Sequence, residues 1–94
     1  DTLHGHGGND YLFGDDGDDN LYGWGDDDDL DGWYGNDDLY GMNGNDYLLG
    51  FYGNDNLYGG DGNDSLYGEA DTDYADGGAG TDSCDAETEV NCEF

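Results

Sequence analysis

Aspartate recurs at every ninth residue of this chain, and these carboxylates are the groups best suited to bind a ligand. The recurring residues are Asp1, Asp10, Asp19, Asp28, Asp37, Asp46, Asp55, Asp64, Asp73 and Asp82. The 94 residues include 26 acidic side chains and no Lys or Arg, so the formal net charge is −26. This charge favours cations as ligands. Because no basic side chain can contact phosphate, it excludes nucleic acid and an anionic membrane surface as partners. No apolar run exceeds three residues, which also excludes a membrane-inserted helix.

The available ligands favour calcium among the cations. Calcium accepts flexible coordination by many oxygen atoms, whereas magnesium requires a stricter octahedron and retains water. Zinc and copper prefer His or thiolate ligands, of which the chain has few. His4 and His6 form an H-x-H pair without a third ligand nearby, so we treat the pair as incidental. The Asp-rich stretch 26–31 lacks the closing Glu and the flanking helices of an EF-hand.

The aspartates belong to a nine-residue repeat that runs without insertion or deletion from Gly5 to Asp85, after a partial unit at residues 1–4. Position one is Gly in all nine full units, position four is Gly in seven, and position eight is Leu from Leu3 to Leu66. Six glycine-rich residues followed by three centred on Leu predict a tight turn and a minimal strand, with position eight inward. We expect the glycines at positions one and four to supply positive φ angles.

This pattern predicts an all-β protein, a parallel β-roll or β-helix solenoid with 18 residues per coil. Stacking the coils about 4.8 Å apart gives a rod roughly 24 Å long and places Asp10 beside Asp28, with the Asp1 and Asp19 series on the opposite edge. Stacked carboxylates repel unless a cation lies between them. Five aspartates per edge leave four gaps per edge, so up to about eight calcium ions could bind. We expect chelation, or acid that protonates the aspartates, to unfold the chain.

Three units, GMNGNDYLL, GFYGNDNLY and GGDGNDSLY, resemble the RTX, or haemolysin-type, calcium-binding nonapeptide repeat, and the resemblance covers residues 1–85. It implies a β-roll that bacteria secrete, unfolded in calcium-poor cytoplasm and folded outside. It also implies that calcium is held by the position-six aspartates above and by turn backbone carbonyls. The glycines that match the turn positions are Gly8, Gly17, Gly35, Gly44, Gly53, Gly62 and Gly80.

Two features depart from that family pattern. Asp26 and Asp71 replace the position-four glycine, which puts sites that use those turns in question. Position two, usually Gly in the family, carries large side chains in the central units, and we expect these to bulge from the turns. They are Trp24, Trp33, Met42 and Phe51.

The last nine residues, AETEVNCEF, break the repeat, so we divide the chain into a repeat domain, 1–85, and a C-terminal capping segment, 86–94. Cys84 stands at an inward position eight, and Cys92 follows eight residues later. In an extracellular protein, this spacing favours a disulfide over two buried free thiols. Such a bond would fold the segment across the open end of the core, with Val90 and Phe94 as expected apolar contacts.

Outward positions carry aromatic side chains in rows along the stack. We assign nine outward residues to a self-association surface, because contiguous exposed apolar area is unusual for a free monomer. They are Phe13, Tyr22, Trp24, Trp33, Tyr40, Leu49, Phe51, Tyr58 and Tyr67. The alternative is that stacking between coils only stabilises the sheets.

These observations favour a secreted, extracellular, calcium-binding structural protein that self-associates into a fibre or matrix. One alternative is a calcium-triggered secretion and folding module of a larger bacterial exoprotein. Another is a module that binds polysaccharide through its Tyr and Trp rows. We do not predict an enzyme, because Ser65 and Ser83 have no plausible histidine base and no carboxylate pair stands apart from the repeat.

Overall fold

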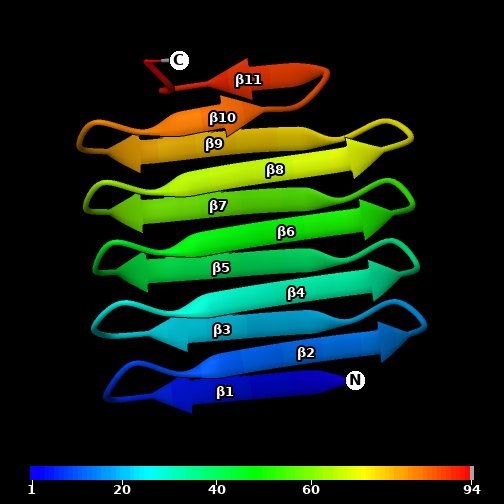
Figure 1. Cartoon of the computed structure of the whole chain (residues 1–94), viewed down its shortest axis with the longest axis horizontal. Helices are drawn as coiled ribbons and strands as arrows, with labels where there is room; N and C mark the ends of the chain where they lie inside the picture. The colour runs from blue at the N-terminus through cyan, green and yellow to red at the C-terminus, as the bar shows by residue number, and fades with distance from the viewer. Residues whose placement is uncertain (94) are drawn as a thin grey trace.

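The structure is a computed structural model that describes residues 1–93, and these residues form β-strands joined by short turns (Figure 1). The strands are β1 (Thr2–His6), β2 (Tyr11–Asp16), β3 (Asn20–Trp24), β4 (Asp29–Tyr34), β5 (Asp38–Asn43), β6 (Tyr47–Tyr52), β7 (Asn56–Asp61), β8 (Ser65–Ala70), β9 (Tyr74–Ala79), β10 (Ser83–Asp85) and β11 (Thr88–Val90). The described residues contain no helix, and therefore none that could cross a membrane.

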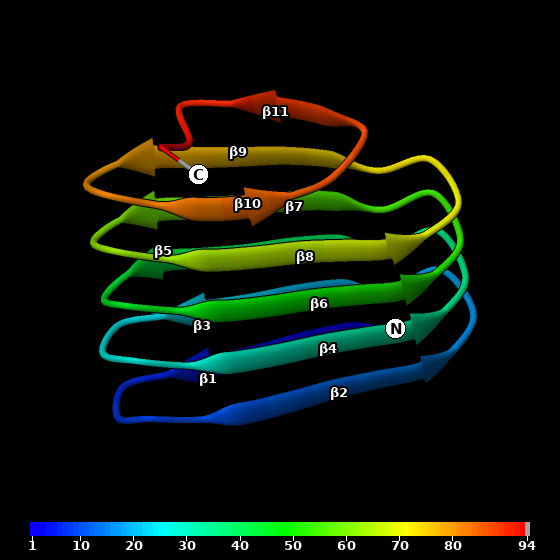
Figure 2. The ribbon, with the colours of Figure 1, turned by 45° about the horizontal axis from the view of Figure 1, so that its top comes forward.

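The strands alternate between two parallel sheets, which confirms the predicted solenoid. One sheet has the order β1-β3-β5-β7-β9-β11 and the other has the order β2-β4-β6-β8-β10. Pairing is in register at 18 residues, so Leu21 faces Leu39 and Tyr22 faces Tyr40. The molecule measures 28 × 27 × 12 Å, so it is a flat slab and not the rod that we expected. Its two long edges are formed by the turns (Figures 1 and 2).

The core between the sheets is a single column of position-eight side chains. Its members are Leu12, Leu21, Leu30, Leu39, Leu48, Leu57, Leu66, Ala75 and Cys84. The leucines from Leu21 to Leu66 have no exposed surface. The inward orientation of position eight is therefore confirmed.

The strands are longer than the predicted three residues. A typical strand, such as β6, has six residues and continues through positions one, two and three of the next unit. Trp33, Met42 and Phe51 therefore lie within strands and Trp24 ends β3, so the prediction that they bulge from the turns is wrong. The expectation for position one was also wrong, because the positive φ angles fall at positions two and four; Trp33, for example, has φ 80°.

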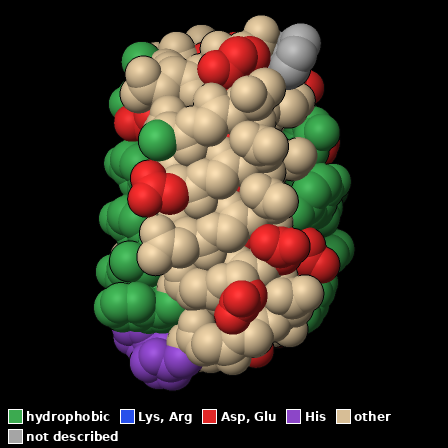
Figure 3. Space-filling view, turned by 90° about the vertical axis from the view of Figure 1, so that its left-hand side faces the viewer, with side chains coloured by type: hydrophobic (Ala, Val, Ile, Leu, Met, Phe, Trp, Pro, Cys, Tyr) green, Lys and Arg blue, Asp and Glu red, His purple; other side chains and the backbone are tan. Residues whose placement is uncertain are grey.

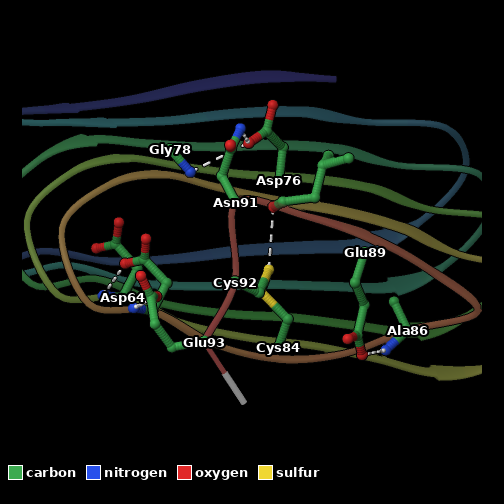
Figure 4. Close-up of a disulfide and its surroundings, with 11 residues drawn as sticks. Asp64, Asp76, Gly78, Cys84, Ala86, Glu89, Asn91, Cys92 and Glu93 are labelled. Carbon is green, nitrogen blue, oxygen red and sulfur yellow. Dashed lines mark hydrogen bonds between the residues drawn. A yellow bond between two sulfur atoms is a disulfide. The ribbon is translucent and has the colours of Figure 1, made fainter.

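The C-terminal segment closes one end of the slab. β11 pairs with β9, with Thr88 opposite Tyr74, and folds over the end of the core (Figure 2). The predicted disulfide between Cys84 and Cys92 is present, with Cα atoms 5.8 Å apart (Figure 4). Ala86 and Cys92 pack against the leucine column. Val90 is 38% exposed and does not supply the expected apolar contact, and Phe94 lies outside the described residues.

Candidate metal sites along the turn edges

Each turn comprises positions four to six and stacks directly on the turn one coil away. Position four has a left-handed φ, for example 126° at Gly35, which favours glycine. The carbonyl oxygen of Gly17 also lies against Gly35, so that a β-carbon at Gly35 would overlap it. Position-four carbonyls therefore face the gap between successive turns, where the sequence places metal ligands.

The two turns that lack this glycine keep the same backbone. Asp26 and Asp71 adopt left-handed φ angles of 73° and 80°. Their carboxylates accept hydrogen bonds from the backbone N–H groups of Gly8 and Gly53, at 2.9 and 3.0 Å. Each departure from the repeat is thus compensated by a side-chain acceptor.

Position six forms a hydrogen-bonded column along each edge. The backbone N–H of Asp28 donates to Oδ1 of Asp46 at 2.8 Å, and the N–H of Asp46 donates to Oδ1 of Asp64 at 2.8 Å. We call the series Asp10, Asp28, Asp46, Asp64 and Asp82 the Asp10 column, and Asp19, Asp37, Asp55 and Asp73 the Asp19 column. The Asp10 column lies at the left edge in Figure 1, and Figure 3 views the molecule from that edge.

The second oxygen of each of these carboxylates is buried and has no hydrogen-bond partner. The atoms are Oδ2 of Asp10, Asp19, Asp28, Asp37, Asp46, Asp55, Asp64, Asp73 and Asp82. From Asp19 to Asp82 these side chains are at most 2% exposed. A buried, unpaired carboxylate oxygen is costly, so each one requires a proton or a cation.

The position-one glycines form the notches that receive these oxygen atoms. A β-carbon added to Gly5 would lie 2.7 Å from Asp10 Oδ2 and 2.8 Å from the carbonyl oxygen of Gly23. The same relation holds at Gly14, with Asp19 and Gly32. Two oxygen atoms thus converge on one point with no donor between them. Position one must be glycine because any side chain would fill this notch, and not because of its φ angle.

Burial makes the charged form of these aspartates unfavourable. It raises the pKa of Asp46 and Asp55 to about 7, and that of Asp37 and Asp64 to about 6. The hydrogen bond from the preceding aspartate's backbone lowers the pKa, but does not offset burial. Neighbouring carboxylates raise the pKa further. A divalent cation would offset both the cost of burying each charge and the repulsion between neighbouring carboxylates.

The donor set fits calcium. It consists of carboxylate and backbone carbonyl oxygens, and calcium prefers such oxygen ligands. Among the described residues, no group of three or more His, Cys, Asp or Glu side chains is placed to hold a metal. An ion between two stacked aspartates would therefore complete its shell with backbone carbonyls.

The sequence identified the column aspartates correctly as stacked residues but missed one set of oxygen atoms. The structure places the position-one carbonyls, such as those of Gly23 and Gly32, at the same notches as the carboxylate oxygens, and we did not nominate them. The presence of glycine at position one in every full unit was the available signal. Asp1 differs from the other nine predicted aspartates, because its side chain is 87% exposed.

Position five completes the turn architecture. The Oδ1 atoms of Asn36 and Asn45 accept the backbone N–H groups of Asn54 and Asn63, at 2.9 and 2.8 Å. The position is Asn or Asp in every unit except the last two, which carry Thr72 and Thr81. Residues 86–94 do not continue the repeat, so no position-five N–H stacks on these two side chains.

The predicted aromatic ladder is present on the first sheet. The rings of Tyr22, Tyr40 and Tyr58 stack at 4.9 and 5.0 Å, and His4 continues the column at 4.9 Å. On the second sheet Asp31 interrupts the position-nine row, where it accepts a hydrogen bond from the Tyr11 hydroxyl. This bond raises the pKa of Tyr11 to about 12. Stacking there occurs instead between Trp33 and Phe51.

The most exposed aromatic residues include four that we did not assign to the surface: Tyr11, Tyr34, Tyr47 and Tyr52. Tyr34 and Tyr52 stack at 5.0 Å, and each is 49% exposed. Of the nine assigned residues, Phe13 and Trp24 are among the exposed large hydrophobics. Apolar side chains flank the glycine-rich edge on both sides in Figure 3.

Three segments of the chain match the model of one protein family, the RTX calcium-binding nonapeptide repeat (4 copies). They are residues 1–30, 25–48 and 49–84, which together cover residues 1–84. Neither a curated protein nor a solved structure gave a significant match.

Proposed function

Because the chain belongs to the RTX calcium-binding nonapeptide repeat family, we propose that calcium ions bound along both turn edges hold this β-roll in its folded state. The observation that carries the proposal is the set of nine buried carboxylate oxygens without a partner. Calcium supplies the positive charge that the chain lacks. The ten repeated aspartates and the turn carbonyls are the proposed ligands, and up to about eight ions fit between the aspartates.

The residues of each repeat have separate tasks in this proposal. Oδ1 of the position-six aspartate sets the register by accepting the preceding coil's N–H, as Asp46 does for Asp28. Oδ2 remains free for the ion. Glycine at position one keeps the notch open, and glycine at position four brings successive turns close together. Without the ion, the net charge of −26 and the buried carboxylates both oppose folding.

The test is a calcium titration followed by far-UV circular dichroism, with EDTA as the starting condition. Wild-type protein should gain β-sheet signal as calcium is added. Asp46→Asn keeps the Oδ1 acceptor but removes the charge, so its midpoint should lie at severalfold higher calcium. Asp61→Asn, which removes an exposed carboxylate in the same turn region, is the matched control. A spectrum that is identical in EDTA and in calcium would contradict the proposal.

We further propose that the folded protein is extracellular and self-associates into a fibre or matrix. RTX repeats are typical of secreted proteins, where millimolar calcium keeps sites of this kind loaded. The supporting observation is the half-exposed stacked pair Tyr34 and Tyr52, at the ends of β4 and β6, next in the chain to the stacked pair Trp33 and Phe51. Exposed, ordered aromatic side chains are common in protein interfaces.

Sedimentation velocity in calcium tests the association. Wild-type protein should form concentration-dependent oligomers, and the double substitution Tyr34→Ser with Tyr52→Ser should reduce them. Tyr22→Ser on the opposite sheet distinguishes one face from the other. If the wild-type protein stays monomeric at high micromolar concentration, the proposal of self-association is refuted. The proposal of calcium-dependent folding is not affected by that result.

The two alternatives predict different partners. A secretion and folding module would be followed or preceded by other domains in a larger exoprotein, and the gene sequence would show them. Polysaccharide binding is less favoured, because the Tyr22, Tyr40 and Tyr58 rings stack on one another and leave little ring face for a sugar. Binding of the wild-type protein to a glycan array, with loss of that binding in Trp24→Ala, would favour the polysaccharide-binding alternative.

A further inference from the structure

The capping segment places a glutamate at the end of each aspartate column. Asp73 and Asp82 are the position-six aspartates of the last two repeats in residues 1–94, and residues 86–94 do not continue the repeat. The N–H of Asp73 donates to Oε2 of Glu87 at 2.9 Å, and the N–H of Asp82 donates to Oε2 of Glu93 at 2.6 Å. In the earlier repeats, the backbone N–H of each aspartate donates instead to Oδ1 of the aspartate in the next coil, as Asp64 does to Asp82. The two glutamates therefore take the place of that next aspartate as acceptors.

The backbone of the capping segment bonds to the last aspartate on both edges, and on the Asp73 edge it keeps the repeat frame. Thr88 lies opposite Tyr74, so Glu87 precedes β11 as Asp73 precedes β9. The N–H groups of Thr88 and Glu93 donate to the carbonyls of Asp73 and Asp82, at 3.1 and 2.9 Å. In the repeats, the residue after each aspartate makes this bond, for example from Tyr47 to Asp28 at 2.9 Å. Thr88 follows Glu87 in the same way, whereas Glu93 donates its own N–H and so stands one residue later in the frame.

A carbonyl in the capping segment also occupies the place of a position-one glycine carbonyl. A β-carbon added to Gly77 would contact the carbonyl oxygen of Asn91 and lie 2.6 Å from Asp82 Oδ2. At Gly59, one coil earlier, the corresponding contacts are the carbonyl of Gly77 and Oδ2 of Asp64. In the view of Figure 4, Glu93 lies on the same side of the disulfide as Asp64, and Glu89 lies on the other side.

The terminal aspartates carry the same unpaired oxygen atoms as the others. Oδ2 of Asp73 and of Asp82 has no partner, and these side chains are 2% and 0% exposed. A neutral acceptor would satisfy the two N–H groups. A glutamate in that place adds a second negative charge beside a buried carboxylate, which raises the pKa of Asp73 beyond the effect of burial. A cation between the two carboxylates removes this repulsion.

We propose that Glu87 and Glu93 are metal ligands, and that one calcium ion binds between Asp73 and Glu87 and another between Asp82 and Glu93. The second site also uses the carbonyl of Asn91. This inference rests on the proposed calcium binding within the columns and adds one site to each edge. The capping segment then ends each column with a filled site and no unpaired aspartate.

Native mass spectrometry of the full chain, with the disulfide intact and calcium in excess, tests the inference by counting bound ions. Glu87→Gln and Glu93→Gln should each bind one ion fewer than wild type, and the double variant two fewer. Glutamine keeps an amide oxygen for the N–H bonds, so these variants retain the hydrogen bonds of the cap. Glu89→Gln is the matched control, because Glu89 is exposed and accepts only the N–H of Ala86, at 3.1 Å.

The outcomes separate this inference from the proposed function. A wild-type protein that binds no calcium would refute the proposed function. A wild-type protein that binds calcium, with variants that bind the same number of ions at the same affinity, would show that the glutamates only cap the backbone. If the glutamine variants do not fold, Glu93→Asp retains a carboxylate at a greater distance from Asp82. The Glu93→Asp variant should bind as many ions as wild type, but with an affinity for one ion that is at least tenfold lower. Unchanged affinities for all ions would overturn the inference.

Discussion

Transfer of the calcium-free protein from pH 8 to pH 5 is expected to increase its β-sheet content. Burial raises the pKa of Asp46 and Asp55 from 3.8 to about 7, so the folded chain binds these protons more tightly than the unfolded chain. A raised pKa contributes stability that is complete below the unfolded value and is lost as the pH rises through the folded value. For these residues the loss falls between about pH 4 and pH 7.

The size of the effect follows from the shifts. Each pKa unit corresponds to about 1.4 kcal/mol, so a shift from 3.8 to about 7 corresponds to at most about 4 kcal/mol for Asp46. The columns lie at the edges of a slab only 12 Å thick, where water can approach, and we therefore take about 2 kcal/mol per residue. Between pH 8 and pH 5 only part of this is regained: with the same discount, about 1.4 kcal/mol each for Asp46 and Asp55 and about 0.7 kcal/mol each for Asp37 and Asp64, whose pKa rises only to about 6. The four residues together contribute about 4 kcal/mol, which is close to the lower end of the whole stability of a typical domain.

Circular dichroism in EDTA across this pH range measures the effect, with sedimentation velocity to confirm a monomer above the isoelectric point of about 4.1. The double variant Asp46→Asn with Asp55→Asn should depend less on pH, whereas Asp61→Asn should behave as wild type. A calcium-free protein that is equally ordered at both pH values, or less ordered at pH 5, would refute the reasoning. With calcium bound the direction reverses, because protons then compete with the ions. The acid unfolding expected from the sequence therefore applies only to the loaded protein.

Four further predictions concern the loaded protein and are measured by denaturant unfolding in calcium. Leu48→Ala, at a fully buried position, should cost about 2–5 kcal/mol; a cost below 1 kcal/mol would contradict a leucine core. Gly50→Ala should be severely destabilising, because its β-carbon would overlap Asp55 Oδ2 and lie 2.9 Å from the carbonyl oxygen of Gly68. The control Gly7→Ala should be neutral, because its β-carbon would meet no atom within 4 Å. Equal destabilisation by the two substitutions would contradict the notch at the position-one glycines. Reduction of the Cys84–Cys92 bond, which closes a short loop of sequence separation 8, should cost about 2–3 kcal/mol; no change in midpoint would contradict this. Glu69→Gly should stabilise the protein by about 1 kcal/mol, because Glu69 is exposed and its φ of 76° is strained for a residue with a β-carbon. Destabilisation would show that this backbone strain is not costly.

The period of nine was sufficient to predict the solenoid, the parallel register and the leucine column, because each of these depends on which residues recur at one position. The disulfide was predicted from the short spacing between Cys84 and Cys92. The length of the strands did not follow. Positions one to six were predicted as turn, so Trp33 and Phe51 at position two fell outside the strands; their left-handed φ angles of 80° and 79° are ones that such side chains rarely adopt. In the structure they accept the strain and stack on each other at 4.5 Å.

The detailed geometry of the site was less accessible from the sequence. A recurring aspartate indicates a ligand, but not that one carboxylate oxygen bonds the backbone while the other is buried against glycine. Glu87 and Glu93 were invisible to the repeat pattern because the capping segment is shorter than a coil. The chain reaches Glu87 14 residues after Asp73, and Glu93 11 residues after Asp82, instead of the regular 18. Only the folded backbone brings Glu87 to a position-six place, and the carboxylate of Glu93, which stands one residue later in the frame, to the end of the other column.

Within one repeat, a single aspartate links the pairing of the coils to the binding of the ion. Its Oδ1 fixes the neighbouring coil, and this bond forms only when the coils are stacked in register, as Asp46 shows with Asp28. Stacking at the same time buries Oδ2 and makes its charge unfavourable unless calcium or a proton is present. The fold and the ions therefore stabilise each other at every step of the stack. Because each site is shared by two coils, calcium binding and folding should occur together, and partly loaded, partly folded chains should be rare.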